Sequence, residues 1–269
     1  MSATRVEIVA VGRELLTGRT QDTNSNWLAA RVTALGGLVK RMTAVDDVLE
    51  EIAQEVRDAL GRGTRLLVTS GGLGPTPDDM TLAAVAAALR LPLVSDGAAL
   101  EFVAARYSEL AEKGFVASAA LTPPRRKMAV IPQGGTWFPN TVGIAPAVLV
   151  EREPARIYSL PGVPAEMKGI FEARLAEDLC AFLGQRVLVS REVRSGLRDE
   201  SVVAEAVESA VASAPGVHIK PLPARFGPRV NIPIRLSAAG QRREEVESRL
   251  DQAERALKTE LARLRRKRS

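Results

Sequence analysis

Hydrophobic positions in the first half of the chain alternate between two spacings. Short β-rich runs at 6–11, 38–44 and 66–69 are typical of buried strands, and the segments between them repeat apolar residues at helical spacing. The first of these segments, 22–35, stops at a pair of glycines, which favours a helix end there. Strands that alternate with helices in this way predict βαβ units and an α/β fold with a mostly parallel sheet.

Local signals place several further elements. Asp47, with Glu50 three residues later, resembles a capping box for the second helix. Two prolines followed by basic residues at 123–127 predict an exposed connection. Further strands are expected at 127–131, 147–150 and 156–160, and a helix is expected to open at Pro164. These elements continue the α/β alternation to about residue 183.

The order of elements changes after Gly184. The pattern now predicts a strand, a helix, two strands and a long helix, at 187–193, 201–212, 217–221, 230–236 and 244–264. This βαββα order suggests a small α+β module. We therefore expect two domains, 1–184 and 185–269.

Composition narrows the chemistry that the chain can support. It has one cysteine, Cys180, and one histidine, His218, which excludes an internal disulfide, a cysteine zinc site and a histidine-rich metal site. The lone histidine also argues against a Ser–His or Cys–His catalytic pair. Any metal would be held by oxygen ligands, which favour hard cations such as Mg²⁺ or Mn²⁺ over zinc.

Charge and hydropathy exclude two classes of partner. Much of the +5 formal charge sits in the basic tail 263–268, and aromatic residues make up only 4% of the chain. Because such a tail is usually solvated and stacking rings are scarce, we expect no nucleic-acid partner. The N-terminus leads directly into a strand rather than a signal peptide, and no long apolar run follows. We expect a cytoplasmic protein that is not associated with a membrane.

The segment Ser70–Thr81, Ser-Gly-Gly-Leu-Gly-Pro-Thr-Pro-Asp-Asp-Met-Thr, joins a predicted strand to a predicted helix. Its glycines allow backbone N–H groups to approach an anion closely at the start of a helix. It has neither the Gly-Lys-Ser/Thr end of a Walker A loop nor the spacing of a dinucleotide fingerprint. Asp78 and Asp79 could cap the helix, or they could hold Mg²⁺ together with substrate phosphates.

Asp46 follows the second predicted strand, at the edge of the sheet where ligands of open α/β folds gather. It could face Asp79 across one crevice, although an Asx turn or a helix cap would explain it equally well. The polar run Gly18–Asn26 contains more capping and phosphate-binding side chains than one helix start requires. The residues alone therefore suggest a phosphate-binding crevice with acidic walls.

Five motifs in order resemble the CinA (competence/damage-inducible protein) family. They are Val11–Gly18, Asp22–Ser25, Ser70–Thr81, Asn140–Gly143 and Leu160–Met167. The resemblance implies the fold of MoaB, MogA and the gephyrin G domain, a three-layer α/β sandwich, followed by a small KH-like module. Full-length CinA also carries a C-terminal nicotinamide mononucleotide deamidase domain. We expect no deamidase activity from these 269 residues.

The resemblance also implies residue roles. It matches Asp46 and Asp79 to the acidic positions of the family; with the adjacent Asp78 they would be catalytic and would hold the metal, and we expect Asp79 rather than Asp78 to carry the chemistry. The substrate would contact Glu14, Thr23, Asn24, Ser25, Ser70, Gly71, Gly72, Gly74, Thr76, Asn140, Gly143, Pro161, Gly162 and Glu166.

The implied activity is hydrolysis of the pyrophosphate of ADP-ribose or a related dinucleotide with Mg²⁺, Mn²⁺ or Co²⁺. One alternative is a protein of molybdenum cofactor biosynthesis that binds or adenylylates molybdopterin. Another is a non-catalytic nucleotide binder that acts through a partner protein. Because relatives of this fold commonly assemble, we also expect a homodimer or homotrimer.

Overall fold

The computed structural model describes residues 4–184, 186–222 and 231–266. It divides into two compact units, Met1–Thr33 with Gly37–Leu183, and Ala34–Gly36 with Gly184–Ser269. No helix in the described ranges is both long and apolar enough to cross a membrane.

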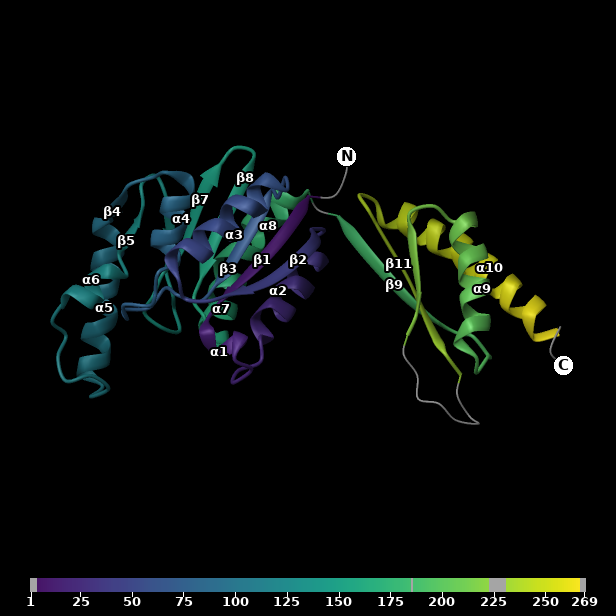
Figure 1. The fold of residues 1–269 in the computed structure, drawn as a ribbon, viewed down its shortest axis with the longest axis horizontal. Coiled ribbons are helices and arrows are strands. Elements are labelled where there is room, and N and C mark those ends of the chain that lie inside the picture. The colour runs from purple at the N-terminus through teal and green to yellow at the C-terminus, as the bar shows by residue number, and fades with distance from the viewer. Residues whose placement is uncertain (1–3, 185, 223–230, 267–269) are drawn as a thin grey trace. The chain divides into compact units, whose positions relative to one another are not determined.

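A mixed sheet forms the centre of the first unit (Figure 1). In its described part the strand order is β2-β1-β3-β8-β7-β6, with parallel pairing from β2 to β8 and antiparallel pairing of β7 and β6 at one edge. The strands are β1 (Arg5–Val11), β2 (Leu38–Val45), β3 (Leu66–Ser70), β6 (Thr136–Phe138), β7 (Ala147–Arg152) and β8 (Ala155–Leu160). The predicted α/β fold with a mostly parallel sheet is confirmed.

Helices follow most strands of this unit. They are α1 (Arg13–Leu16), α2 (Thr23–Ala34), α3 (Leu49–Gly61), α4 (Thr81–Leu89), α5 (Gly97–Glu112), α6 (Pro123–Lys127), α7 (Pro164–Ile170), the π-helix η1 (Phe171–Leu175) and α8 (Ala176–Leu183). A two-stranded ribbon, β4 (Leu93–Ser95) with β5 (Val130–Pro132), flanks α5 and α6 in the chain.

Side chains along each strand point alternately to opposite faces of the sheet, and helices cover both of these faces. On one face, Val9 and Leu67 belong to a core cluster that also contains Val56 of α3 and Val85 of α4. On the other face, α2 and α8 contact the strands, through Asn24–Ser70 and Tyr158–Asp178 hydrogen bonds. The sheet therefore lies between two helical layers, and its carboxyl-end loops remain free to form a site (Figure 1).

Two local predictions are wrong. Asp47 does not cap α3, because its carboxylate accepts a hydrogen bond from the Arg13 backbone nitrogen over 2.8 Å, and the N-cap position is Val48 without a side-chain cap. The segment 123–127, expected to be a plain connection, forms α6, which opens with two prolines at its first positions. Proline fixes φ near its helical value, so this pair starts a helix rather than interrupting one.

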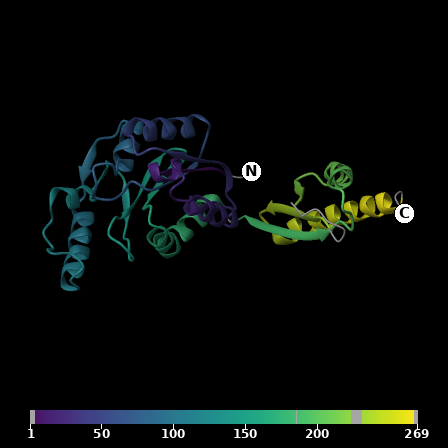
Figure 2. The ribbon, with the colours of Figure 1, turned by 60° about the horizontal axis from the view of Figure 1, so that its bottom comes forward.

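The second unit has the element order β9-α9-β10-β11-α10. These elements are β9 (Val187–Arg194), α9 (Glu200–Ser213), β10 (Val217–Pro221), β11 (Pro233–Gly240) and α10 (Arg243–Arg266). The strands form an antiparallel sheet in the order β10-β11-β9, and α9 and α10 share one apolar core with it (Figure 2). Residue 230, where a strand was expected to begin, and residues 267–268 of the basic tail lie outside the described ranges.

Candidate ligand-binding crevice

A crevice of about 640 Å³ opens at the carboxyl ends of β1, β3 and β8. Its floor and walls come from the loop Gly71–Asp79 and the turn Pro161–Pro164, with Glu14, Asp47 and Glu166 around them. Parallel strands of an open α/β sheet gather their functional loops at this edge. The crevice is thus in the position expected from the sequence.

Glycines in the loop after β3 line the crevice with backbone atoms. Gly71 has a φ of 112°, and a Cβ there would lie 2.2 Å from the carbonyl oxygen of Val11. A Cβ on Gly72 would lie 2.3 Å from the Thr81 hydroxyl, which itself donates to the Gly71 carbonyl over 2.7 Å. Only glycine fits these positions, so the loop presents peptide groups rather than side chains to a ligand.

Thr76 organises the two aspartates at the end of this loop. Its backbone nitrogen and its hydroxyl both lie within hydrogen-bonding distance of the Asp79 carboxylate, at 2.8 Å and 2.7 Å, and the hydroxyl also contacts Asp78. This contact lowers the pKa of Asp78 below its usual range. Helix α4 has Met80 as its N-cap and no side-chain cap, so neither aspartate is a helix cap.

Asp47, rather than Asp46, lines the crevice. The carboxylate of Asp46 forms an ion pair with the Arg13 guanidinium, with 2.8 Å between the nearest atoms, and this pairing lowers the pKa of Asp46. Burial raises the pKa of Asp47, and the nearby carboxylates of Glu14 and Asp78 raise it further. The two adjacent residues, which lie in the bend after β2, therefore have different surroundings.

The described lining of the crevice is acidic. It includes Glu14, Asp47, Asp78, Asp79 and Glu166, and none of the lining residues is a lysine, an arginine or a histidine. No group of three or more histidine, cysteine, aspartate or glutamate side chains among the described residues is arranged as a metal site by itself. The donors are nevertheless all hard oxygens, which suits a cation that takes its remaining ligands from a bound phosphate and water.

Asn24 connects three segments beside the crevice. Its amide nitrogen donates to the Ser70 hydroxyl over 3.0 Å and to the Gly162 carbonyl over 2.7 Å. Thr23, Asn24 and Ser70 line a smaller pocket of about 90 Å³ that shares Glu14 and Gly162 with the crevice. Helix α2 is thereby joined to both loops that form the crevice floor.

Asn140 holds Glu166 and the loop before β7. Its amide nitrogen lies 2.6 Å from the Glu166 carboxylate, and its amide oxygen accepts hydrogen bonds from the backbone nitrogens of Val142 and Gly143. A Cβ on Gly143 would lie 2.1 Å from the Glu166 carboxyl carbon. Asn140 and Gly143 therefore position Glu166 without lining the crevice themselves.

Comparison with known proteins identifies the family. Residues 7–180 match the family described as a probable molybdopterin binding domain. The chain belongs to this family. A Pyrococcus abyssi protein is 40% identical over 230 residues, covering 86% of this chain and 89% of that one, and an Aeropyrum pernix protein is 42% identical over 219 residues, covering 81% and 79%.

A solved structure gives the same relationship. The crystal structure of the CinA protein from Thermoplasma acidophilum is 36% identical, has a TM-score of 0.59, and covers 65% of this chain and 99% of its own. The resemblance to CinA inferred from the motifs is thereby confirmed, and the molybdopterin binding domain occupies the first unit.

Most residues expected at the site of this domain do meet at the crevice or its side pocket. They are Glu14, Thr23, Asn24, Ser70, Gly71, Gly72, Gly74, Asp78, Asp79, Pro161, Gly162 and Glu166. Ser25, Asp46, Thr76, Asn140 and Gly143 do not line either pocket. Ser25 is fully buried, and Thr76, Asn140 and Gly143 act through neighbouring carboxylates.

The sequence did not indicate Tyr107 and Met128 as crevice residues. Tyr107 lies on α5, Met128 follows α6, and the Arg125 guanidinium packs 3.8 Å above the Tyr107 ring. Both residues have the apolar character of core positions, so no chemical signal in the sequence sets them apart. The sequence did contain a signal for Asp47, since it is an acidic residue directly next to Asp46 at the end of the second strand.

Proposed function

We propose that the crevice binds a molybdopterin-type ligand through its phosphate, together with a divalent cation such as Mg²⁺ or Mn²⁺. One observation carries this proposal: glycine backbone without side chains and several carboxylates line the same crevice. The chain that contains it belongs to the probable molybdopterin binding domain family. Loop amides can approach phosphate oxygens closely.

The acidic lining makes a cation necessary for this ligand. A phosphate that enters beside Asp47, Asp78 and Asp79 meets like charge, and the described lining holds no basic residue to offset it. A bound cation would neutralise that charge and make the phosphorus more open to attack. Asp79 and Asp78 would hold the cation from one side and Asp47 from the other.

The reaction that fits these groups is adenylyl transfer. A phosphate oxygen of the molybdopterin-type ligand would form a bond to the α-phosphorus of ATP, and the bond to the departing pyrophosphate would break. The glycine backbone would orient the phosphates, and the carboxylates would keep the cation beside them. Tyr107 and Met128 add an apolar part to the lining of the crevice.

The second candidate reaction at the same crevice is the one that the resemblance of the motifs to the CinA family implied. There, water would attack the pyrophosphate of ADP-ribose, and AMP and ribose 5-phosphate would separate. Both reactions require the same cation and loop, so they differ in the nucleophile and not in the carboxylates. The expected homodimer or homotrimer stays a prediction for either reaction.

The test offers both substrate sets to the purified protein with Mg²⁺, Mn²⁺ or Co²⁺. Formation of adenylylated molybdopterin and pyrophosphate from ATP and molybdopterin supports the first reaction, and release of AMP from ADP-ribose supports the second. Asp79→Ala and Asp47→Ala are each expected to lower the rate at least about a hundredfold. Failure of molybdopterin to bind with any of these metals would rule out the proposed ligand.

Asp46→Ala is the matched control. It removes a neighbouring carboxylate that contacts Arg13 and the Asp47 backbone nitrogen and does not line the crevice. We expect it to keep most of the activity, because an exposed ion pair contributes little to the fold. Equal losses in Asp46→Ala and Asp47→Ala would contradict the assignment of Asp47.

A further inference from the structure

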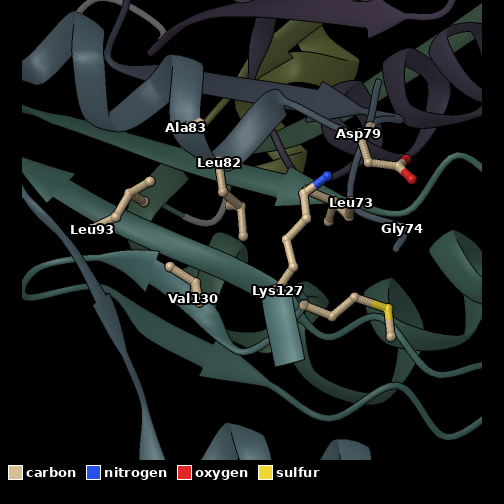
Figure 3. A pocket seen from close by; sticks show the side chains of 10 residues that line it. Leu73, Gly74, Asp79, Leu82, Ala83, Leu93, Lys127 and Val130 are labelled. Carbon is tan, nitrogen blue, oxygen red and sulfur yellow. The ribbon is translucent and has the colours of Figure 1, made fainter. Parts of the chain in front are cut away.

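Lys127 is a basic residue that contacts the acidic loop from outside the crevice. It is the last residue of α6, and its ammonium donates a hydrogen bond to the backbone carbonyl of Thr76. Figure 3 shows the Lys127 side chain reaching toward the loop that carries Leu73, Gly74 and Asp79. Lys127 and Asp79 also line one small cavity of about 60 Å³ behind the loop.

The Thr76 carbonyl is a central point of the turn that carries the aspartates. The same oxygen accepts a hydrogen bond from the Asp79 backbone nitrogen over 3.1 Å. The nitrogen and hydroxyl of Thr76, in turn, hold the Asp79 carboxylate. Fixing the Thr76 peptide therefore fixes the direction in which Asp79 presents its oxygens.

Contacts on both sides of the turn also support its arrangement. The Asp79 carboxylate packs against Gly74, where a Cβ would lie 2.6 Å from its nearer oxygen. On the other side, α6 packs against α5, because the Arg125 guanidinium stacks on the Tyr107 ring. Lys127 thus joins this helix to the turn.

We propose that Lys127 is a positioning residue: its bond to the Thr76 carbonyl sets the direction of the Asp78 and Asp79 carboxylates and thereby the affinity of the crevice for a divalent cation. The proposal rests on the cation binding of the proposed function. Groups that orient metal ligands typically change metal affinity by about 10–100-fold when they are removed.

The charge of Lys127 and its positioning contact predict opposite changes in cation affinity for Lys127→Met. Removing a positive charge near the carboxylates would, by itself, strengthen binding of a cation. Loss of the contact that orients the turn would weaken it. The sign of the change therefore separates a positioning role from a simple electrostatic one.

The experiment titrates Mn²⁺ alone into the full chain and measures free Mn²⁺ by electron paramagnetic resonance. Lys127→Met is expected to weaken Mn²⁺ binding about tenfold, and Lys127→Arg, which keeps a charged donor, to restore most of it. Lys113→Met removes the same charge from an exposed position at the end of α5 and should leave binding unchanged. Thermal unfolding of each variant verifies that it is folded.

Unchanged or tighter Mn²⁺ binding in folded Lys127→Met would overturn the positioning role while leaving the proposed function in place. If Lys127→Met does not fold, Lys127→Gln provides the same test, because it replaces the ammonium that donates to the Thr76 carbonyl with a shorter, neutral side chain. Affinity in Lys127→Gln equal to that of the unaltered chain would count against positioning through this turn. Absence of Mn²⁺ binding by the unaltered chain would overturn the positioning proposal, whereas the proposed function is decided separately by the binding of molybdopterin in the presence of each metal.

Discussion

The side-chain amide of Asn140 lies 2.6 Å from the Glu166 carboxylate and joins the loop before β7 to an acidic wall of the crevice. Asn140 is fully buried, and it also donates to the Ala145 carbonyl over 3.0 Å. A buried amide that satisfies several neighbours at once is costly to lose, because each neighbour is left without a partner. This residue therefore connects the stability of the domain to the position of Glu166.

We expect Asn140→Ala to destabilise the protein by about 3 kcal/mol, since the Val142 and Gly143 nitrogens and the Ala145 carbonyl lose their bonds. Urea unfolding of the variant measures this change. Asn26→Ala, at an exposed position of α2, should alter stability by less than about 0.5 kcal/mol. Similar small effects for both variants would contradict the role given to Asn140.

Gly71 should tolerate no side chain. With a φ of 112° and only 2.2 Å between the place of a Cβ and the Val11 carbonyl oxygen, backbone movement is the only relief. We expect Gly71→Ala to cost at least about 3 kcal/mol. Gly61→Ala, at the end of α3, meets no atom within 4 Å and should change the unfolding free energy by less than about 1 kcal/mol. Chemical denaturation compares the two, and equal costs would exclude a special need for glycine at 71.

The α/β alternation and the glycine loop were predictable from the sequence because both depend on local patterns. Apolar spacing marks β1 and α2, and the glycines of the loop after β3 serve a backbone conformation that other residues avoid. The short strands β4 and β6 have three residues each, too few to show a period. Such elements depend on pairing with distant segments.

The surroundings of Asp47 were not predictable for the same reason. The capping box was a reasonable local interpretation, but the partner of its carboxylate is the Arg13 backbone nitrogen, 34 residues away. Tyr107 likewise reaches the crevice through the packing of α5 and α6. Chemistry that depends on contacts between distant segments requires the folded structure.

Glu7 provides a prediction about pH. Its side chain is buried on β1, where it accepts hydrogen bonds from the Thr64 hydroxyl over 2.7 Å and from the Arg62 and Arg5 guanidinium groups. Burial favours the protonated form, but the hydrogen bonds from Arg62, Thr64 and Arg5 outweigh it and leave the pKa of Glu7 below its ordinary value of 4.5.

Because the pKa is lower in the folded state, the unfolded chain binds this proton more readily in acid. The stability contributed by Glu7 is therefore complete above about pH 4.5 and is lost as the pH falls through the lower folded value.

We expect Glu7→Gln to destabilise the protein by about 2 kcal/mol at pH 7, because Arg62 loses a charged partner. The difference between the two proteins should shrink below pH 4.5. Urea unfolding at a series of pH values measures it, with Glu112→Gln on the exposed end of α5 as a control that shows little difference at any pH. A gap between Glu7→Gln and the unaltered protein that stays constant down to about pH 3 would mean that the buried carboxylate is not what makes the domain sensitive to acid.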